Sequence, residues 1–117
     1  MHSTRSAEVD RCIEACQSCH EICVESVHHC LHLGGKHAEA DHIGLMLDCA
    51  AICLTDAEFM MRSSPLHHEV CAACAAVCEA CATSCEALAD ERQMRLCADQ
   101  CRRCAELCRE MAKAHSH

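Results

Sequence analysis

The chain has 117 residues and a formal charge of −8, from 18 acidic and 10 basic side chains. This length predicts one domain, residues 1–117, because a second hydrophobic core needs more chain. The negative charge disfavours nucleic acid and anionic membrane surfaces as partners. No apolar run approaches the roughly 18 residues that cross a bilayer. The first residues, MHSTRSAEVDRC, lack an apolar signal region, so we expect a cytoplasmic protein.

The apolar content of the chain depends on cysteine. Hydrophobic residues make up 51% of the sequence, but this figure includes 16 Cys, whereas Leu, Ile, Val and Phe together number only 19. So few large aliphatic side chains are typical of disordered chains unless cysteine forms the core. Gly and Pro are scarce, at three and one, which disfavours the loop-rich disulfide framework of a small secreted protein. In a reducing compartment, the thiols are predicted to be metal ligands or redox groups.

Breaks in composition divide the chain into four helical segments. Gly34–Gly35, Ser63–Pro65 and Ala89–Glu91 separate Ala- and Glu-rich stretches that favour helix. We expect Ser64 to cap the third helix and Pro65 to be its first residue. Short links between long helices predict an all-α fold, an antiparallel up-down-up-down four-helix bundle. The predicted helices span residues 7–33, 39–63, 66–88 and 91–114.

Helical periodicity places the cysteines in the interior. Core positions of a bundled helix recur at alternating spacings of three and four, and we call each such row a seam. The seams also contain His42, Met46, Asp56, Met60, His67, Met94, Met111 and His115. Thiols therefore occupy the positions where a bundle normally carries leucine. All sixteen cysteines fall on a seam: Cys12, Cys16, Cys19, Cys23, Cys30, Cys49, Cys53, Cys71, Cys74, Cys78, Cys81, Cys85, Cys97, Cys101, Cys104 and Cys108.

The spacing within each seam suits metal binding better than disulfides. Side chains one helical turn apart have Cβ atoms about 5–6 Å apart, whereas a disulfide needs roughly 3.5–4.5 Å. Pairing between different helices remains open, but two sulfurs on adjacent turns can hold one metal ion. The pattern C-x₃-C occurs seven times, at Cys12–Cys16, Cys19–Cys23, Cys49–Cys53, Cys74–Cys78, Cys81–Cys85, Cys97–Cys101 and Cys104–Cys108.

The metal is predicted from the softness of the thiolate ligands and from the charge that each bound ion would leave in the interior. Thiolates favour Cu(I), Zn(II) and iron–sulfur clusters. A Cu(I) ion that replaces a thiol proton leaves the interior near neutral, whereas each isolated Zn(II)–Cys₄ site would bury two negative charges. Ferredoxin cysteines follow a different spacing on a loop. We predict multiple Cu(I) ions. The alternatives are an iron–sulfur or dithiol electron carrier, a metallothionein-like Zn(II) binder, and a bundle whose cysteines only pack.

The other seam residues have more than one possible role. Thioethers also bind Cu(I), but methionine often fills gaps in a core, so both roles stay open for Met46, Met60, Met94 and Met111. His42 and His115 are equally candidates for ligands or for surface residues at helix ends, and His67 is a weaker candidate. Asp56 could approach a metal, hydrogen-bond a thiol or face water. No Ser/His/Asp arrangement or Gly-rich phosphate loop suggests an enzyme.

Four motifs together resemble the cytosolic branch of the copper storage protein family. They are CIEACQSCHEIC (12–23), CAAIC (49–53), CAACAAVCEACATSC (71–85) and CADQCRRCAELC (97–108). The resemblance implies a homotetramer of four-helix bundles, each storing many Cu(I) ions mainly on cysteine pairs. It also implies protection against copper toxicity, a supply for cuproenzymes, a copper chaperone as donor and copper access at one open end.

The chain departs from that family at the expected mouth. The family's link between helices three and four is rich in histidine, but the corresponding segment here, EALADERQMRL (86–96), has none. Met94 stands where another cysteine would continue the seam. The same bundle end carries His42 and Met46, and His28, His29, His32 and His37 lie near the first link. The resemblance therefore predicts that ligands for incoming copper come from these other elements.

Overall fold

In the computed structural model, the described residues are 5–113, and they form helices without any strand. The all-α fold class is thus confirmed, and the predicted helix ends within this range differ from the observed ones by at most two residues. Within residues 5–113, no helix combines the length and apolar character that crossing a lipid bilayer demands. The helices are α1 (Ala7–Leu33), the 3₁₀ helix η1 (Gly35–Ala38), α2 (Ala40–Met61), α3 (His67–Glu86) and α4 (Arg92–Lys113).

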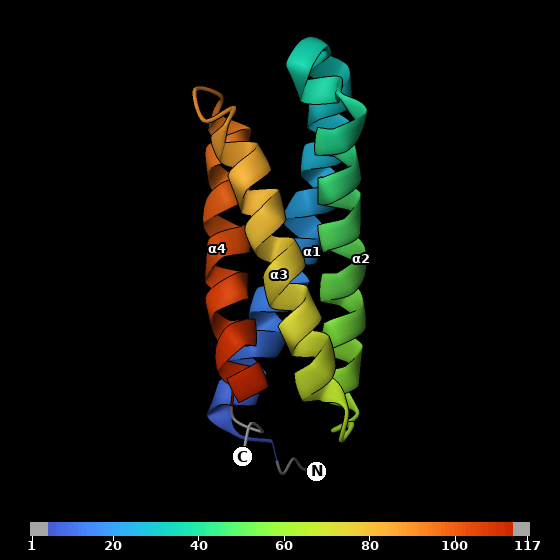
Figure 1. The fold of residues 1–117 in the computed structure, drawn as a ribbon, viewed down its shortest axis with the longest axis vertical. Helices are drawn as coiled ribbons and strands as arrows, with labels where there is room; N and C mark the ends of the chain where they lie inside the picture. Colours follow the sequence, from blue (N-terminus) through green and yellow to red (C-terminus); the bar gives the residue numbers. More distant parts are fainter. Residues whose placement is uncertain (1–4, 114–117) are drawn as a thin grey trace.

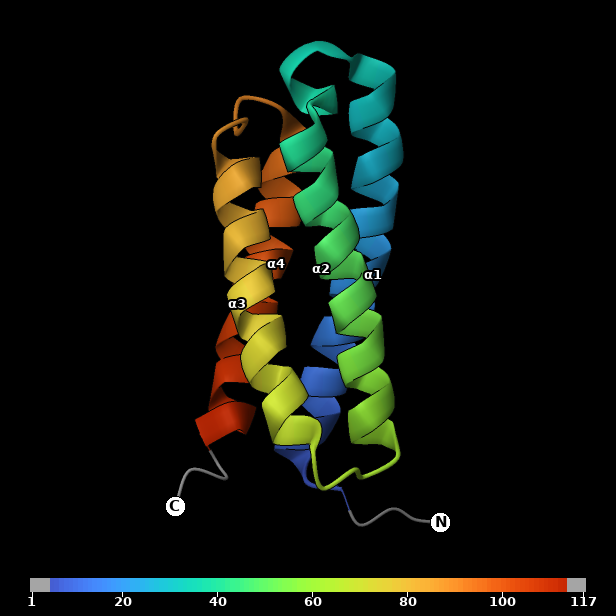
Figure 2. The same cartoon turned by 45° about the vertical axis from the view of Figure 1, so that its right-hand side comes forward.

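The helices alternate in direction along the bundle, as Figures 1 and 2 show. Each α-helix packs against two neighbours, and α4 closes the bundle by packing on α1. Within the described residues the backbones of diagonally opposite helices do not come close, although side chains of α2 and α4 meet across the axis. The links 34–39 and 87–91 lie together at one end, which we call the upper end. The link 62–66 lies at the opposite, lower end. This arrangement confirms the up-down-up-down topology.

Local hydrogen bonds fix both ends of α1. The Ser6 hydroxyl accepts a hydrogen bond from the Val9 N–H at 3.1 Å, and Glu8 and Asp10 place negative charge in the first turn. Both features stabilise a helix N-terminus. The helix ends at Gly34, whose φ of 75° favours glycine and whose N–H donates to the Cys30 carbonyl at 3.1 Å. These caps explain why the predicted and observed bounds of α1 agree.

The predicted capping of α3 was wrong. Leu66, not Ser64, is the N-cap residue, and Pro65 lies in the preceding turn rather than in the helix. The Ser64 hydroxyl accepts a hydrogen bond from the Leu66 N–H at 3.1 Å, only two residues ahead. Serine forms such local turns as readily as it caps helices. Because the Ser64 hydroxyl takes part in this turn, α3 begins only at His67.

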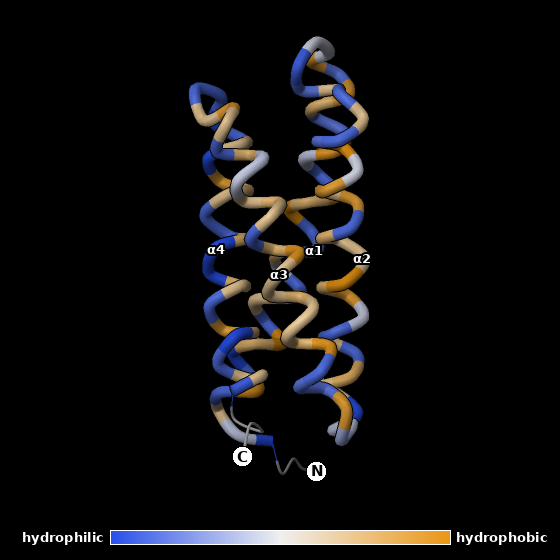
Figure 3. Tube along the Cα trace, in the orientation of Figure 1, coloured by the Kyte–Doolittle hydropathy of each residue, from blue (hydrophilic) through white to orange (hydrophobic). Residues whose placement is uncertain are grey.

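Small side chains let the helices approach closely. Figure 3 shows polar and apolar positions alternating along the tube, as expected of helices with one buried face. Directly after a seam residue, α2, α3 and α4 each bury two alanines seven residues apart, and these alanines are at most 6% exposed. Alanine at these positions keeps adjacent helices close enough for side chains as short as cysteine to meet across the interior. They are Ala50, Ala57, Ala75, Ala82, Ala98 and Ala105.

We expect the reduced, metal-free protein to be folded and strongly helical. Neutral thiols pack as small hydrophobic groups, so burying them requires no metal to neutralise charge, unlike the ligands of a zinc finger. Far-UV circular dichroism of reduced apoprotein measured under anaerobic conditions checks this. A coil spectrum that becomes helical only after metal addition would contradict it.

Candidate metal centre

All sixteen cysteines lie inside the bundle. Each has 0% relative exposure, and none takes part in a disulfide. The Sγ atoms of cysteines on different helices approach to 3.6 Å, as between Cys19 and Cys49. A disulfide bond would bring them to about 2.05 Å. The interior is therefore lined with reduced thiols in van der Waals and hydrogen-bond contact.

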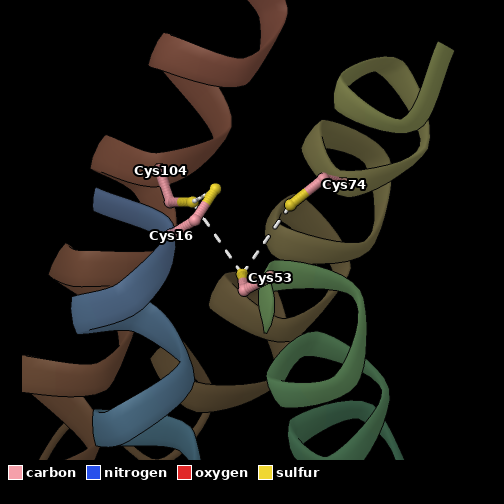
Figure 4. Close-up of side chains that lie close together, drawn as sticks. All are labelled: Cys16, Cys53, Cys74 and Cys104. Carbon is pink, nitrogen blue, oxygen red and sulfur yellow. Dashed lines mark hydrogen bonds between the residues drawn. The ribbon is translucent and has the colours of Figure 1, made fainter. Parts of the chain in front are cut away.

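One thiol from each helix meets inside this lining, as Figure 4 shows. The Sγ atoms of Cys16, Cys53, Cys74 and Cys104 all lie within 4.8 Å of one another. The Cys104 and Cys16 sulfurs are 3.6 Å apart, and those of Cys53 and Cys74 are 3.7 Å apart. Four soft ligand atoms thus converge on a space of the size that a metal ion occupies.

Such groups overlap along the axis. This group shares Cys53 and Cys104 with a second group, which shares Cys19 with a third. The third shares Cys23 and Cys101 with a fourth. Because neighbouring groups use the same sulfurs, the lining is one connected column rather than a set of separate sites. In order, these four groups are Cys16/Cys53/Cys74/Cys104, Cys19/Cys53/Cys78/Cys104, Cys19/Cys23/Cys49/Cys101 and Cys23/Cys81/Cys97/Cys101.

Burial favours the neutral form of the thiols, while hydrogen bonds among them raise the pKa of some and lower that of others, such as Cys104. Hydrogen bonding with Cys104 and other thiols, together with burial, raises the pKa of Cys53. Hydrogen bonding with Cys19 and its neighbours, with burial, likewise raises the pKa of Cys101. A thiol with a raised pKa keeps its proton at neutral pH, and a metal ion must displace that proton to bind.

A buried carboxyl group ends the column near the lower end. Asp56 has 0% exposure and accepts hydrogen bonds from the thiols of Cys71 at 3.1 Å and Cys108 at 3.4 Å. Burial raises the pKa of Asp56 to about 7, although these hydrogen bonds oppose the shift. Of the three roles left open for Asp56, the structure shows the hydrogen bond to thiols. A carboxylate oxygen of Asp56 also lies within 4.8 Å of the Sγ atoms of Cys16, Cys74 and Cys108, so the four side chains could hold a metal ion together.

At the upper end, a histidine and a methionine join the thiols. His42 Nε2 lies 3.7 Å from Cys30 Sγ and 3.2 Å from Met94 Sδ, and its Nδ1 lies 2.7 Å from Ser84 Oγ. Burial, with the nearby His37, lowers the pKa of His42 and favours its neutral form. Burial, with the charge of Glu91, raises the pKa of Cys30 to about 11.

The remaining predicted side chains differ in their surroundings. Met60 Sδ lies 3.9 Å from Cys71 Sγ, and Met46 and Met111 are buried at 0% and 9% exposure. His67 is the first residue of α3, at the lower end, and its Nδ1–H donates to the Ser64 carbonyl at 2.9 Å. His115 lies outside the described residues.

Most histidines outside the seams take part in other interactions or face solvent. His20 Nδ1–H donates to the Ala50 carbonyl at 2.7 Å, and His29 Nε2 lies 3.0 Å from Glu91 Oε2. His28 and His32 are exposed. His37 is the exception, because its Nδ1 approaches Cys30 Sγ at 4.0 Å.

Sequence reasoning missed the residues that support the upper site. Ser84 lies outside any seam, and only the folded bundle brings it to His42. Ser26 is also buried, and sequence reasoning missed its partner Gln93, whose side-chain N–H donates to the Ser26 hydroxyl at 3.0 Å. The alanines beside the thiols did carry a signal, namely their seven-residue spacing.

A four-helix bundle with a continuous interior column of reduced thiols is a binding protein for several soft metal ions. The sequence model of the copper storage protein family matches residues 5–113. The chain therefore belongs to the copper storage protein family. A search of curated proteins found no match.

Solved structures of similar proteins have the same fold. Protein Nmul_A1745 of Nitrosospira multiformis is 45% identical, with a TM-score of 0.87 over 92% of this chain and 97% of that one. The Cu(I)-bound storage protein BsCsp3, whose apo form is described from Bacillus subtilis, is 39% identical, with a TM-score of 0.83 over 90% and 98%. A cytosolic copper storage protein of Streptomyces lividans with five coppers is 30% identical, with a TM-score of 0.80 over 91% and 92%.

We expect the stability of the apoprotein to depend on Asp56. Its pKa of about 7 lies above the ordinary value of 3.8, so the folded state binds the proton more tightly than the unfolded state. This contribution is fully present below about pH 4 and is lost as the pH rises through 7. The substitution Asp56→Asn should therefore raise the free energy of unfolding of the reduced apoprotein more at pH 8 than at pH 4. The difference between the two effects should be on the order of a few kcal/mol. Urea unfolding of both proteins at the two pH values measures this, and an equal effect of the substitution at both would contradict it.

Proposed function

We propose that the chain stores Cu(I) reversibly on the thiolates of its interior. The observation that carries this proposal is the overlap of the four-thiol groups, which places soft ligands along the bundle without a break. The relatives support it, because BsCsp3 is described as Cu(I)-bound and a Streptomyces lividans protein is described as loaded with ten copper equivalents. Such a column provides positions for many Cu(I) ions rather than one high-affinity site.

We assign the ligand set from the contacts inside the bundle. All sixteen cysteines serve as principal ligands, because every one of them faces the interior. Among the thioethers, Met60 and Met94 contact thiols directly, and His42 contacts both Cys30 and Met94. Buried Met46 and Met111 are additional candidates, and His115 remains a candidate from the sequence alone.

Charge balance governs loading. Each Cu(I) that binds a cysteine displaces the thiol proton, so one positive charge leaves as another enters. The interior then stays close to neutral, which avoids the large cost of burying unpaired thiolates. Because binding releases protons, the uptake of Cu(I) becomes weaker as the pH falls.

The shared sulfurs also distinguish Cu(I) from the alternatives. Structural Zn(II) sites use four ligands around each ion, but here Cys53 and Cys104 each belong to two groups at once. Sharing suits an ion that accepts low coordination numbers and bridging thiolates. Iron–sulfur clusters are held by cysteines on a wrapping loop in ferredoxins, whereas these cysteines lie within helices.

We propose a storage role without catalytic turnover, in the cytoplasm. The reduced state of all sixteen thiols and the cytosolic description of a Streptomyces lividans relative support that location. There the protein would protect the cell from free copper and hold copper for cuproenzymes. Two buried titratable groups, Asp56 and His42, lie beside thiols. They contact ligand atoms rather than a cavity for an organic substrate.

We also propose a homo-oligomer, a tetramer by resemblance to the family, that receives copper from a Cu(I)-carrying chaperone. The outer face of α2 supports self-association. Leu47 and Leu54 are 51% and 43% exposed there, and Ala51 between them lines a shallow groove with Ile52 and Val77. Exposed apolar side chains in a row are typical of surfaces that bind other proteins.

Titration of the reduced protein with Cu(I) tests the proposed storage. In competition with a strong Cu(I) chelator, we expect tight uptake of many ions, comparable to the number of thiols, because the column is continuous. Atomic absorption of the protein fraction gives the count. Saturation after one or two ions would refute storage.

The substitution Cys53→Ala should lower the capacity without unfolding the protein. Cys53 Sγ contacts four other sulfurs, of Cys49, Cys74, Cys78 and Cys104, at 3.6 to 4.0 Å. Its loss therefore removes a shared ligand, and we expect about one or two fewer Cu(I) per chain. The matched control is Ser26→Ala, because Ser26 is equally buried but bonds to Gln93 rather than to a thiol. Equal capacity in both variants would contradict the assignment of Cys53.

A further inference from the structure

The sulfur atoms of the column form closed triangles as well as groups of four. In each triangle, the three Sγ atoms lie 3.6 to 3.9 Å from one another. Cys16 and Cys104, which meet in Figure 4, form one side of the first triangle. Three of the triangles have no residue in common, and together they use nine of the sixteen thiols. They are Cys16/Cys104/Cys108, Cys19/Cys49/Cys101 and Cys53/Cys74/Cys78.

The size of these triangles suits a centre that makes three bonds to sulfur from the apex of a pyramid. Sulfur atoms bonded to one centre at about 2.3 Å lie roughly 4.0 Å apart when the three bonds are in one plane. In a pyramid the sulfur atoms lie closer together. The sides of the triangle Cys19/Cys49/Cys101 are 3.6, 3.7 and 3.9 Å, all shorter than the planar value. A pyramidal centre therefore fits after a small contraction.

Trivalent arsenic has this geometry, because its three bonds and its lone pair of electrons form a pyramid. It is also a soft centre, and soft centres bind thiolates. In neutral water it is present as arsenous acid, As(OH)₃, which carries no charge. An uncharged molecule enters an apolar interior at a much lower cost than an ion does.

The reaction of arsenous acid with three thiols leaves the interior uncharged. Three As–S bonds form and three As–O bonds break, and each hydroxide leaves as water together with the proton of one thiol. Arsenic stays trivalent, so the reaction needs neither an oxidant nor a reductant. The product, As(S-Cys)₃, is neutral, which avoids the cost of a buried charge. Copper differs, because Cu(I) arrives as a cation and its binding releases protons.

We infer that the column also binds trivalent arsenic, as three As(S-Cys)₃ centres, one in each of the three triangles. This adds a second class of ligand, an uncharged metalloid hydroxide, to the metal cation of the proposed function. The inference is independent of copper storage, because it depends only on the positions of the thiols in the reduced, metal-free protein.

Titration of the reduced, full-length apoprotein with sodium arsenite under anaerobic conditions tests this inference. At saturation, native mass spectrometry should count three arsenic atoms per chain, each with the loss of three thiol protons, because each triangle supplies three thiols. Arsenic X-ray absorption should show three sulfur neighbours and no oxygen neighbour. Any other count at saturation, or an oxygen neighbour on bound arsenic, would overturn the inference.

Two further measurements separate arsenic binding from copper storage. Arsenic uptake should be equal at about pH 6 and about pH 8, whereas copper uptake should weaken at the lower pH, because only copper releases protons. Protein saturated with Cu(I) should take up no arsenic, since both use the same sulfurs. Arsenic uptake by copper-saturated protein would refute the triangles and leave storage intact. A copper load of only one or two ions would refute storage and leave the arsenic centres intact.

The substitution Cys19→Ala, with Cys85→Ala as its matched control, locates one centre. Each removes one fully buried thiol, so both variants should lose a similar part of the copper capacity. Cys19 belongs to one triangle and Cys85 to none of the three. We therefore expect two arsenic atoms in Cys19→Ala and three in Cys85→Ala. Far-UV circular dichroism checks that each variant is helical, and Cys101→Ala removes the same triangle from α4 if Cys19→Ala does not fold. Equal arsenic counts in variant and control would refute the assignment.

Discussion

The contact of sulfur with sulfur across the bundle axis is the interaction on which this protein depends. Cysteine is short, so thiols from different helices reach 3.6–4.0 Å only if the helix backbones lie close together. The buried alanines that follow seam residues allow this approach. Larger side chains at those positions would separate the helices and split the column. The packing of small residues therefore also determines how much metal the bundle can bind.

Electrical neutrality links the empty and the loaded states. Without metal, burial raises the pKa of thiols such as Cys53, so these thiols keep their protons and pack as uncharged groups. Copper then exchanges with protons one for one. A monovalent, soft ion can fill such a column without a large change in buried charge. The same fold can thus exist with different amounts of metal, as storage requires.

The two ends of the column have different chemistry. At the lower end, Asp56 adds an oxygen acceptor that hydrogen-bonds to thiols, and at the upper end His42 and Met94 add nitrogen and thioether ligands. Both groups add other ligand atoms at the ends of a lining that otherwise consists of thiols. The His-poor link between α3 and α4 agrees with this division, because the imidazole near the upper end comes from α2 instead.

The sequence by itself determined the fold class, the helix ends to within two residues and the inward direction of the cysteines. These features depend on the local residues that end a helix and on a period of 3.5 residues, and both can be recognised in a single sequence. Tertiary structure alone decided which residues meet across helices. Ser84 with His42 and Gln93 with Ser26 are 42 and 67 positions apart, and no periodicity pairs them. Whether Ser64 capped α3 or closed a turn was likewise decided by the path of the lower link, because both conformations suit serine.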